Sequence, residues 1–353
     1  MKKLTIIVTG AGAPGIMGTI FSLRKNYDNR EIKIIGTDIQ NDVIGKYFCD
    51  KYYVIPKASD SENYLNTLLS ICEIEGVDVV LPQNTAELIV LASNKSKFEA
   101  IGTSVAVSNL NSIEIANNKY KLMETCTELE FQTAKFYLVN NFNKLYHYAG
   151  KLGWPNKKIV VKPPISNGSR GVRIIDENIN RRELFYKEKP TSLFITMEEL
   201  KNILGDSFPE LVVMEYISGE EYTVDVLRTE KKIVVIPRKR DLIRSGITFN
   251  ATTERNEKII EYSKKISEKI NLTHCFGFQF IMDEGGEPKI LECNPRVQGT
   301  MVLATFAGAN IIYSSIKSSL GEDIPDFNIK WGTRILRYWG AIADFNGQML
   351  HRI

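Results

Sequence analysis

The chain has 353 residues, of which 43% are hydrophobic and 25% charged. That balance is ordinary for a globular enzyme of about two or three domains and excludes a largely disordered chain. A formal net charge of +3, from 45 basic and 42 acidic residues, gives no case for nucleic acid as the main partner.

The N-terminal stretch and the cysteines favour a cytoplasmic protein. The apolar run at residues 4–8 is too short for a secretory signal or a membrane span. The five cysteines show no C-x-x-C spacing, which is typical of reduced thiols. We therefore expect a soluble cytoplasmic protein without a membrane partner.

The first hundred or so residues alternate between predicted strands and helices. Strands are predicted at 4–8, 32–36 and 77–81, and helices from the glycine-rich turn toward Tyr27, at 61–74 and at 86–93. This alternation predicts a parallel sheet of βαβ units, that is, a Rossmann-like α/β domain over residues 1–110.

Near residue 109 the pattern changes to that of an α+β body. A helix is predicted to begin around Ser112 and to carry Asn118 and Lys119, and an amphipathic helix is predicted at 256–269. Strands are predicted at 135–139, 159–162, 211–216, 222–228 and 232–237, and a hairpin from 277–282 and 289–293.

The strongest motif is the run from Ile290 to Gly299, which contains E-x-N-P-R. Side chains two residues apart on a strand point the same way, so Glu292 and Asn294 aim two oxygens at one point. Mg²⁺ prefers such oxygen ligands, and Gln279 on the preceding strand can supply a third. Arg296 can form a forked pair of hydrogen bonds to a carboxylate or phosphate. A solvated polar hairpin face is the alternative interpretation.

A second motif places Lys162 at the end of an apolar strand, directly before a Ser/Gly loop that runs from Pro163 to Val172. A point charge followed by flexible backbone N–H donors is typical of phosphate sites, although the P-loop spacing is absent. A third motif, residues 213–225, carries Glu215 and Glu221 on either side of a break at Gly219. Carboxylates there can accept hydrogen bonds from ribose hydroxyls.

The order of Lys119, VVKPPISNGSRGV, MEYISGEEYTVD and FGFQF…KILECNPRVQ resembles the ATP-grasp superfamily. It is most similar to the branch of the carbamoyl phosphate synthetase large subunit and to pyrrolysine-pathway ligases. The resemblance runs from about Leu4 to about Leu320. It implies an ATP-grasp domain over 111–340, with a lid subdomain at about 125–212 and a metal-binding catalytic subdomain at 213–340.

The resemblance also implies roles for individual residues. Lys119 and Lys162 would contact the ATP phosphates, and Arg296 would steady the transferred phosphoryl group or the substrate carboxylate. The remaining assignments are a loop over the phosphates (Ser166, Gly168, Gly171), an adenine segment (Glu215, Tyr216, Ile217), a ribose contact (Glu221) and ligands for Mg²⁺, or Mn²⁺ in its place (Gln279, Glu292, Asn294). Arg240 and Arg244, in the charged segment 238–246, are further catalytic candidates near the acyl phosphate, with a solvated loop as the alternative.

The chemistry implied is ligation. A carboxylate would attack the γ-phosphorus of ATP, and an amine would then attack the acyl phosphate and release phosphate. A thiol or hydroxyl acceptor would use the same first step, and bicarbonate activation is an alternative within the superfamily. The partners expected are small carboxylate and amine molecules and a second copy of the chain in a homodimer.

Another class remains open from the N-terminal turn. Gly10, Gly12 and Gly15 follow a strand, and Asp38 ends the next one, which is the fingerprint of a dinucleotide-dependent oxidoreductase. Residues 82–87 follow the third predicted strand and face the same edge. Asn84 and Glu87 are substrate candidates there, although Thr85 as a helix cap is the favoured interpretation of this turn.

Overall fold

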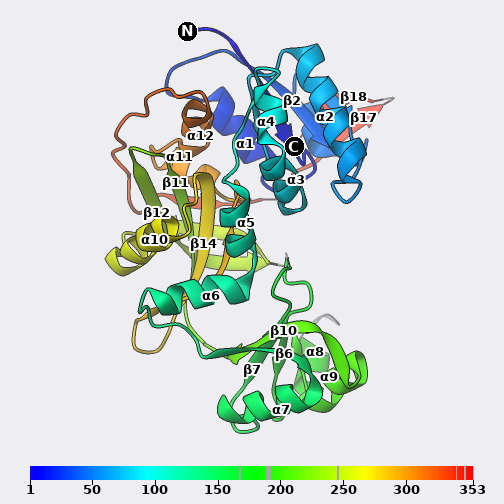
Figure 1. Ribbon diagram of the computed structural model, residues 1–353, viewed down its shortest axis with the longest axis vertical. Helices are drawn as coiled ribbons and strands as arrows, with labels where there is room; N and C mark the ends of the chain where they lie inside the picture. Colours follow the sequence, from blue (N-terminus) through cyan, green and yellow to red (C-terminus); the bar gives the residue numbers. More distant parts are fainter. Residues whose placement is uncertain (167, 188–191, 245, 339, 346, 353) are drawn as a thin grey trace. The chain divides into compact units, whose positions relative to one another are not determined.

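A computed structural model describes residues 1–353 except 167, 188–191, 245, 339, 346 and 353. The chain forms two compact units (Figure 1). The first contains Met1–Ala116, Glu221–Gln279 and Cys293–Ile353, and the second contains Asn117–Glu220 and Phe280–Glu292.

Five parallel strands form the N-terminal sheet of the first unit, in the order β3-β2-β1-β4-β5. Both faces of the central strand β1 are buried, because Ile6 and Val8 pack into one hydrophobic cluster and Ile7 into another. The strands are β1 Leu4–Thr9, β2 Ile32–Asp38, β3 Lys51–Val54, β4 Val79–Leu81 and β5 Ser104–Val105. This parallel sheet confirms the predicted α/β domain.

The helices that join these strands are short and bury one apolar face each. In α2, Tyr64, Leu65, Leu68 and Ile71 recur at helical spacing, and the helix ends at Gly76, whose φ of +60° suits glycine. The helices are α1 Ile16–Arg24, α2 Ser61–Glu75, α3 Leu88–Ser93, α4 Lys95–Glu99 and α5 Leu110–Asn117, with 3₁₀ turns η1 Ile44–Tyr47 and η2 Thr85–Glu87.

A second sheet has the strand order β15-β14-β11-β12-β13-β16. Its pairs β11–β12, β12–β13 and β13–β16 are antiparallel. The strands are β11 Glu221–Arg228, β12 Ile233–Arg244, β13 Ile247–Thr253, β14 His274–Met282, β15 Pro288–Asn294 and β16 Arg334–Leu336. The later part of the chain also forms α10 Glu257–Lys269, α11 Val302–Phe306, α12 Ile311–Ser319 and the hairpin β17 Ile342–Phe345 with β18 Gln348–Arg352.

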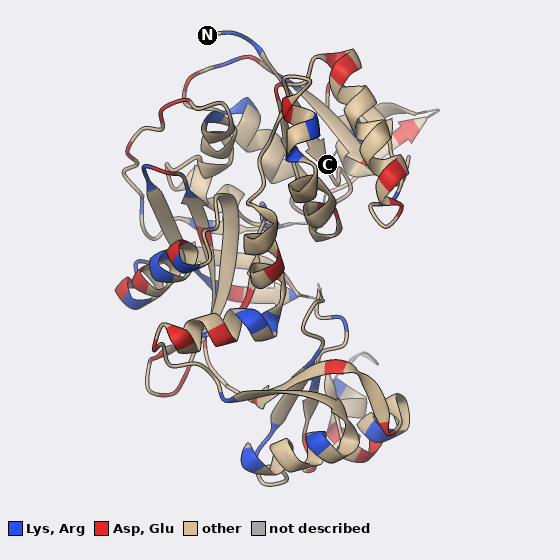
Figure 2. Cartoon of the chain, in the orientation of Figure 1, with Lys and Arg blue, Asp and Glu red and all other residues tan. Residues whose placement is uncertain are grey.

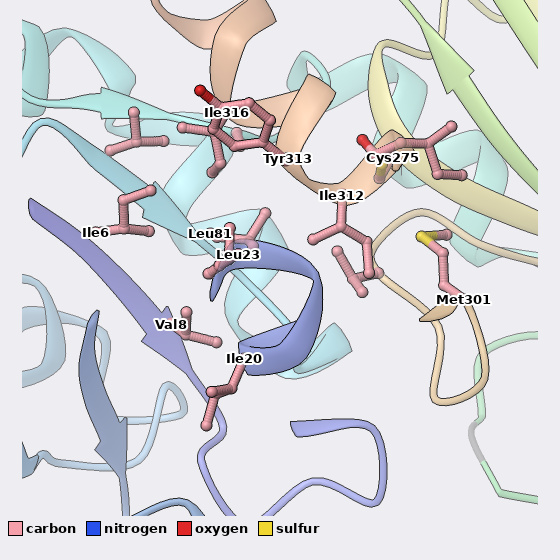
Figure 3. Packing of buried hydrophobic residues seen from close by; sticks show 14 of the residues in the cluster. Ile6, Val8, Ile20, Leu23, Leu81, Cys275, Met301, Ile312, Tyr313 and Ile316 are labelled. Atoms are coloured by element: carbon pink, nitrogen blue, oxygen red, sulfur yellow. Dashed lines mark hydrogen bonds between the residues drawn. The ribbon is translucent and has the colours of Figure 1, made fainter. Parts of the chain in front are cut away.

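One hydrophobic cluster joins distant segments of the first unit. Ile6, Val8 and Leu81 from the parallel sheet lie with Ile312 and Tyr313 of α12 (Figure 3). Cys275 and Met301 belong to the same cluster. The N-terminal domain and the later segments of the chain are therefore parts of one folding unit, which strand periodicity alone does not reveal.

The second unit contains a five-stranded sheet in the order β6-β10-β7-β8-β9. Helix α7 packs there because Phe142, Leu145 and Ala149 recur on one face and are buried with Val139 and Val161. The elements are β6 Phe136–Asn141, β7 Ile159–Lys162, β8 Arg173–Ile175, β9 Phe194–Ile195, β10 Ser207–Glu215, α6 Lys119–Glu128, α7 Phe142–Lys151, α8 Arg181–Lys187 and α9 Met197–Leu204. The α+β architecture expected after residue 110 is therefore confirmed.

The structure departs from the local expectations in the following places. The helix predicted to run through residues 118–119 is two helices, because the Asn118 side chain accepts hydrogen bonds from the N–H groups of Tyr120 and Lys121 and begins α6. Strand β3 was not expected. The segment 238–246 does not begin as a loop, since β12 continues to Arg244 and pairs with β13.

Charges of both signs lie together on the exposed helices, as on α10 in Figure 2. Among the described residues, no helix is both long enough and apolar enough to cross a membrane.

Candidate active site

Two buried lysines of the second unit lie beside one carboxylate. Lys119 is the first residue of α6, and its Nζ lies 3.5 Å from Glu292 Oε2. Lys162 is the last residue of β7, and its Nζ donates to the carbonyl oxygen of Leu291 at 3.2 Å. Each lysine is only 6% exposed. Two of the predicted phosphate contacts and one predicted metal ligand are thus brought together.

Burial shifts the protonation of Lys162. Desolvation lowers the pKa of its ammonium group to about 8, the charge of Glu292 opposes this shift, and the charge of Lys119 adds to it. An anion bound beside both lysines would favour the charged form of Lys162, so this cluster has the electrostatics of a polyanion site.

The Ser/Gly loop follows Lys162 in the sequence and contacts Lys119. Lys119 Nζ donates to the carbonyl oxygen of Ser166 at 2.7 Å and lies 3.4 Å from its Oγ. Gly168 and Gly171 have φ of +61° and +76°, and a Cβ at position 171 would lie 2.7 Å from Pro163 Cγ. Glycine is therefore required at position 171 by both conformation and space. Asn167 lies outside the described residues.

The predicted adenine segment lies at the end of β10. The Glu215 carboxylate accepts a hydrogen bond from the N–H of Lys135 at 3.0 Å, and the Tyr216 ring lies 5.8 Å from Lys158 Nζ. Both residues line a surface hollow of about 610 Å³, whereas Ile217 does not. The hollow is basic, and its lining includes Lys135, Lys151, Lys157 and Lys158.

In the first unit, Arg240 joins two other predicted residues. Its Nη1 donates to Glu221 Oε2 at 2.7 Å and to Gln279 Oε1 at 3.4 Å, and its Nε donates to Thr248 Oγ1 at 3.0 Å. Arg240 lies on β12, between β11 and β13, and this position in the sheet brings the three partners within reach. The predicted ribose contact and one predicted metal ligand are therefore held by the same guanidinium.

Arg244 does not join this cluster through any described contact. It is exposed at the end of β12, and its guanidinium carbon lies 4.8 Å from the centre of the Phe249 ring. Ser245, in the same charged segment, lies outside the described residues.

Asn294 and Arg296 lie next to the carboxyl edge of the parallel sheet. Arg296 Nη2 donates to Asn294 Oδ1 at 3.2 Å, and its Nε donates to Thr85 Oγ1 at 2.9 Å. Thr85 is thus not the helix cap that was favoured. Asn84 is the cap, because its side chain accepts a hydrogen bond from the N–H of Ala86.

Glu87 is a buried acid at this edge. Its carboxylate accepts a hydrogen bond from Thr9 Oγ1. Burial raises the pKa of Glu87 to about 7, and the negative charge of Asp38 raises it further. The hydrogen bond from Thr9 and the positive charge of Arg296 act in the opposite direction. The sequence makes Glu87 a candidate substrate contact, and its burial brings the pKa of this carboxyl close to neutral pH.

The glycine-rich turn is filled by the protein itself. The N–H of Gly12 donates to Asp38 Oδ2 at 2.8 Å, so the predicted ribose acid of a dinucleotide site binds the turn's own backbone. A Cβ at Gly15 would lie 2.7 Å from the Cα of Gly299. Close packing at Gly12 and Gly15 and a φ of +62° at Gly10 explain these glycines without a dinucleotide.

The predicted metal ligands are hard oxygen donors, which suits Mg²⁺. Only Glu292 among them carries a charge, and no group of three His, Cys, Asp or Glu side chains within the described part of the chain could hold a metal ion. A carboxylate and two amides are the kinds of oxygen donor that Mg²⁺ binds together with phosphate oxygens.

Two arginines that the sequence did not single out are the buried Arg238 and the half-buried Arg337. Arg238, on β12, forms an ion pair with Asp225, with Nε and Oδ2 at 2.8 Å. Arg337 follows β16 and donates through Nη1 to the carbonyl oxygen of Pro14 at 3.2 Å. Arg238 begins a run of charged residues, so the sequence does not indicate that its side chain is buried. Arg337 follows no recognisable motif.

Comparisons with known proteins agree with this architecture. Residues 6–106 match the family model "PylC-like, N-terminal domain", and residues 207–336 match the model "ATP-grasp in the biosynthetic pathway with Ter operon". The carbamoyl phosphate synthase large chain of Caldanaerobacter subterraneus subsp. tengcongensis is 26% identical over 284 residues. That match covers 76% of this chain and 24% of the synthase, so the chain spans about a quarter of the length of this relative.

Solved structures share the fold. The biotin carboxylase domain of Hydrogenobacter thermophilus 2-oxoglutarate carboxylase, a dimer in complex with MgADP, ADP and bicarbonate, has a TM-score of 0.67 at 17% identity, over 94% of this chain and 73% of that one. The L-amino acid ligase from Bacillus licheniformis has a TM-score of 0.62 at 14% identity, over 90% and 74% of the two chains. Residues 6–106 therefore resemble a PylC-like N-terminal domain and residues 207–336 an ATP-grasp domain, in a fold that these solved structures share.

Proposed function

We propose that the protein is an ATP-dependent ligase that activates a carboxylate as an acyl phosphate and couples it to an amine. The observation that carries this proposal is the cluster of Lys119, Lys162 and Glu292. Two buried ammonium groups favour a polyphosphate, and the adjacent carboxylate is a suitable ligand for the Mg²⁺ that accompanies ATP.

The nucleotide would be bound by residues already assigned from the family resemblance. Lys119 and Lys162 would hold its phosphates, with the loop residues Ser166, Gly168 and Gly171 above them. Glu215, Tyr216 and Ile217 would bind the adenine and Glu221 the ribose. Gln279, Glu292 and Asn294 would hold Mg²⁺, which neutralises phosphate charge when bound, and Mn²⁺ shares the same preference for oxygen ligands.

The chemistry follows in two steps. An oxygen of the substrate carboxylate attacks the γ-phosphorus, the bond from that phosphorus to the bridging oxygen breaks, and ADP leaves. The amine nitrogen then attacks the acyl carbon, the bond to the phosphate oxygen breaks, and the amine loses a proton. Arg296 would steady the phosphoryl group through its guanidinium, with Arg240 and Arg244 as further cations for the acyl phosphate.

The comparisons support this class of reaction. The fold is shared with an L-amino acid ligase, which supports an amine acceptor. Bicarbonate activation is the second candidate, favoured by the relative among carbamoyl phosphate synthases and by Gln279, an amide where many members of the superfamily have an acid.

ADP release tests the proposal. Purified protein is incubated with MgATP and a panel of carboxylates, bicarbonate included, each with and without amines. We expect ADP release that requires one class of carboxylate, and we expect Lys162→Ala and Glu292→Ala to abolish it. Glu198→Ala, an exposed carboxylate on α9 of the same unit, is the matched control. Release with bicarbonate alone would support the second candidate, and full turnover in either site variant would refute the site.

Several properties accompany this function in the proposal. The substrates are small molecules, the protein is a cytoplasmic homodimer, and the domain boundaries are 1–110 and 111–340 with subdomains at about 125–212 and 213–340. A dimeric carboxylase domain of the same fold supports the homodimer. Light scattering of the purified protein tests the homodimer, and limited proteolysis tests the domain boundaries.

A further inference from the structure

A turn of the parallel-sheet domain, η2, contacts the guanidinium group of Arg296. Arg296 Nε donates to Thr85 Oγ1 at 2.9 Å, and Thr85 is only 6% exposed. A hydrogen bond from a charged group to a buried hydroxyl is shielded from water, so it restrains the orientation of the guanidinium. Arg296 Nη2 also donates to Asn294 Oδ1 at 3.2 Å. The guanidinium is therefore oriented from two directions.

The turn itself is fixed at both ends by one hydroxyl group. Thr9, the last residue of β1, accepts a hydrogen bond from the N–H of Gln83 at 3.2 Å and donates to the carboxylate of Glu87. Gln83 Oε1 accepts a further hydrogen bond from Thr19 Oγ1 of α1 at 2.7 Å. Thr9, Gln83 and Glu87 are all buried, so water does not compete for these bonds.

The backbone that follows Arg296 packs closely on the same domain. Val297 is buried in the hydrophobic cluster that contains residues of β1 and β4. A Cβ at Gly18 of α1 would lie 2.8 Å from Val302 Cβ, so the backbone of α1 lies directly against α11. Since this backbone is fixed by packing, the long side chain of Arg296 keeps most of the remaining freedom, and Thr85 restrains it.

Glu87 is connected to Arg296 by charge as well as by the turn. Burial and the charge of Asp38 raise the pKa of this carboxyl, and the charge of Arg296 lowers it. Burying a carboxyl group costs free energy that an apolar side chain in the same turn would not. Glu87 follows Thr85 by two residues and binds Thr9, which is the position from which a side chain can hold Thr85 in place.

We propose that Thr85 and Glu87 are positioning residues for Arg296. Thr85 restrains the guanidinium through Nε, and Glu87, through its bond with Thr9, holds the turn that carries Thr85. This inference rests on the proposed ligase function, in which Arg296 steadies the transferred phosphoryl group. It assigns the parallel-sheet domain a part in phosphoryl transfer.

The kinetics of ADP release test the role of Thr85. Thr85→Val removes the hydroxyl at nearly constant volume, and we expect kcat to fall roughly tenfold to hundredfold, as for the loss of a hydrogen bond to a charged group. KM for ATP should stay the same, because Lys119 and Lys162 are unchanged. Thr85→Ser, which restores the hydroxyl, should recover most of the loss.

A double-mutant cycle separates positioning from general damage. Arg296→Lys lacks the guanidinium, so adding Thr85→Val to it should lower kcat little further. Glu87→Leu should likewise lower kcat in the wild type and have little effect in Arg296→Lys. Glu87→Gln, whose amide oxygen can accept the hydrogen bond from Thr9, should keep most of the activity.

Thr103→Val is the matched control for the loss of a buried hydroxyl. Thr103 is 1% exposed in the same unit and donates through Oγ1 to the carbonyl oxygen of Val77 at 2.7 Å. We expect this variant to lose stability, measured by urea unfolding, and to keep the kcat of the wild type.

The Nε–H group of Arg296 gives a readout that does not need turnover. In a ¹H–¹⁵N correlation spectrum, its signal is the one that is absent from Arg296→Lys. We expect its hydrogen exchange to be at least about tenfold slower in the wild type than in Thr85→Val, because the hydrogen bond to a buried hydroxyl protects the proton.

The outcomes separate this inference from the ligase proposal. Fast exchange in the wild type, or equal exchange in Thr85→Val, overturns the inference whether or not ADP is released. Protection that depends on Thr85, without ADP release from any carboxylate, supports the positioning of Arg296 and refutes the ligase. ADP release that Thr85→Val lowers equally in both backgrounds, or not at all, overturns the inference and leaves the ligase intact.

Discussion

Lys119 Nζ lies 3.5 Å from Glu292 Oε2, so a predicted phosphate contact and a predicted metal ligand form an ion pair. Lys119 is almost fully buried and Glu292 is 28% exposed. The strand β15 and the helix α6 are distant in sequence, and this ion pair joins them in the second unit.

Exchanging the two charges distinguishes structure from catalysis. In Lys119→Glu/Glu292→Lys the ion pair is retained, and we expect the free energy of unfolding to be closer to that of the wild type than in either single variant. ADP release should nevertheless fall at least about hundredfold, because a lysine cannot bind a metal ion and a glutamate repels phosphate. Urea unfolding and the ADP assay measure the two effects. Restored turnover in the double variant would show that the pair is only structural.

The affinity for ATP should depend on pH through Lys162. Its pKa of about 8 lies below the ordinary value, so the ammonium is charged below pH 8 and loses its proton above it. We expect KM for ATP to rise above pH 8, by up to about tenfold per pH unit. Lys162→Arg, whose guanidinium stays charged, should remove this rise. A flat profile in the wild type would contradict the assignment.

The lowered pKa of Lys162 also predicts that stability increases above pH 8, whereas the affinity for ATP decreases there. Between pH 8 and the ordinary lysine pKa of 10.5, Lys162 is largely neutral in the folded protein and still protonated in the unfolded chain. The contribution of Lys162 to the free energy of unfolding therefore increases as the pH rises through this window. Lys162→Met should remove that contribution, which unfolding at pH 8 and pH 10 measures against the wild type.

Glu87 should destabilise the first unit as pH rises through the neutral range. Its folded pKa of about 7 lies above the ordinary value of 4.5, so the carboxyl's contribution is fully present below pH 4.5 and declines up to pH 7. The decline is on the order of 3 kcal/mol at 1.36 kcal/mol per pKa unit. Glu87→Gln should be less sensitive to pH over this window in urea unfolding. An identical pH dependence in the variant would show that Glu87 does not titrate there.

The buried pair of Arg238 and Asp225 should behave as a unit. Removing one partner leaves a buried charge, so Arg238→Met and Asp225→Leu should each cost about 3–5 kcal/mol of unfolding free energy. The double variant should be more stable than either single one, because no charge is left uncompensated. Additive losses in a double-mutant cycle would show that the two residues do not interact.

Much of the fold follows from the sequence because its signals are local. The alternation of strands and helices gives the parallel sheet, and the spacing in Glu292-Cys293-Asn294 buries Cys293 between two half-buried polar residues. Local signals failed where a single side chain changes the backbone, as where Asn118 ends one helix and begins α6.

Other parts depend on contacts between distant segments. Strand β3 is short and its side chains are half-buried or exposed, so it shows no strong alternation, and pairing with β2 defines it. The charged residues 238–244 remain a strand because β13 pairs along them, β11 pairs with Arg238 and Lys239, and Asp225 neutralises Arg238. Arg337 acquires its place only through contacts with Pro14 and Gly299, which no motif predicts.

The central claim is that a carboxylate oxygen attacks the γ-phosphorus of ATP. The direct measurement uses the carboxylate that gives most ADP in the panel, labelled with ¹⁸O in its carboxyl group, and mass spectrometry of the phosphate released after the amine reacts. Formation of an acyl phosphate predicts one ¹⁸O atom in each phosphate. Phosphate without label, released at the same rate as ADP, would contradict it.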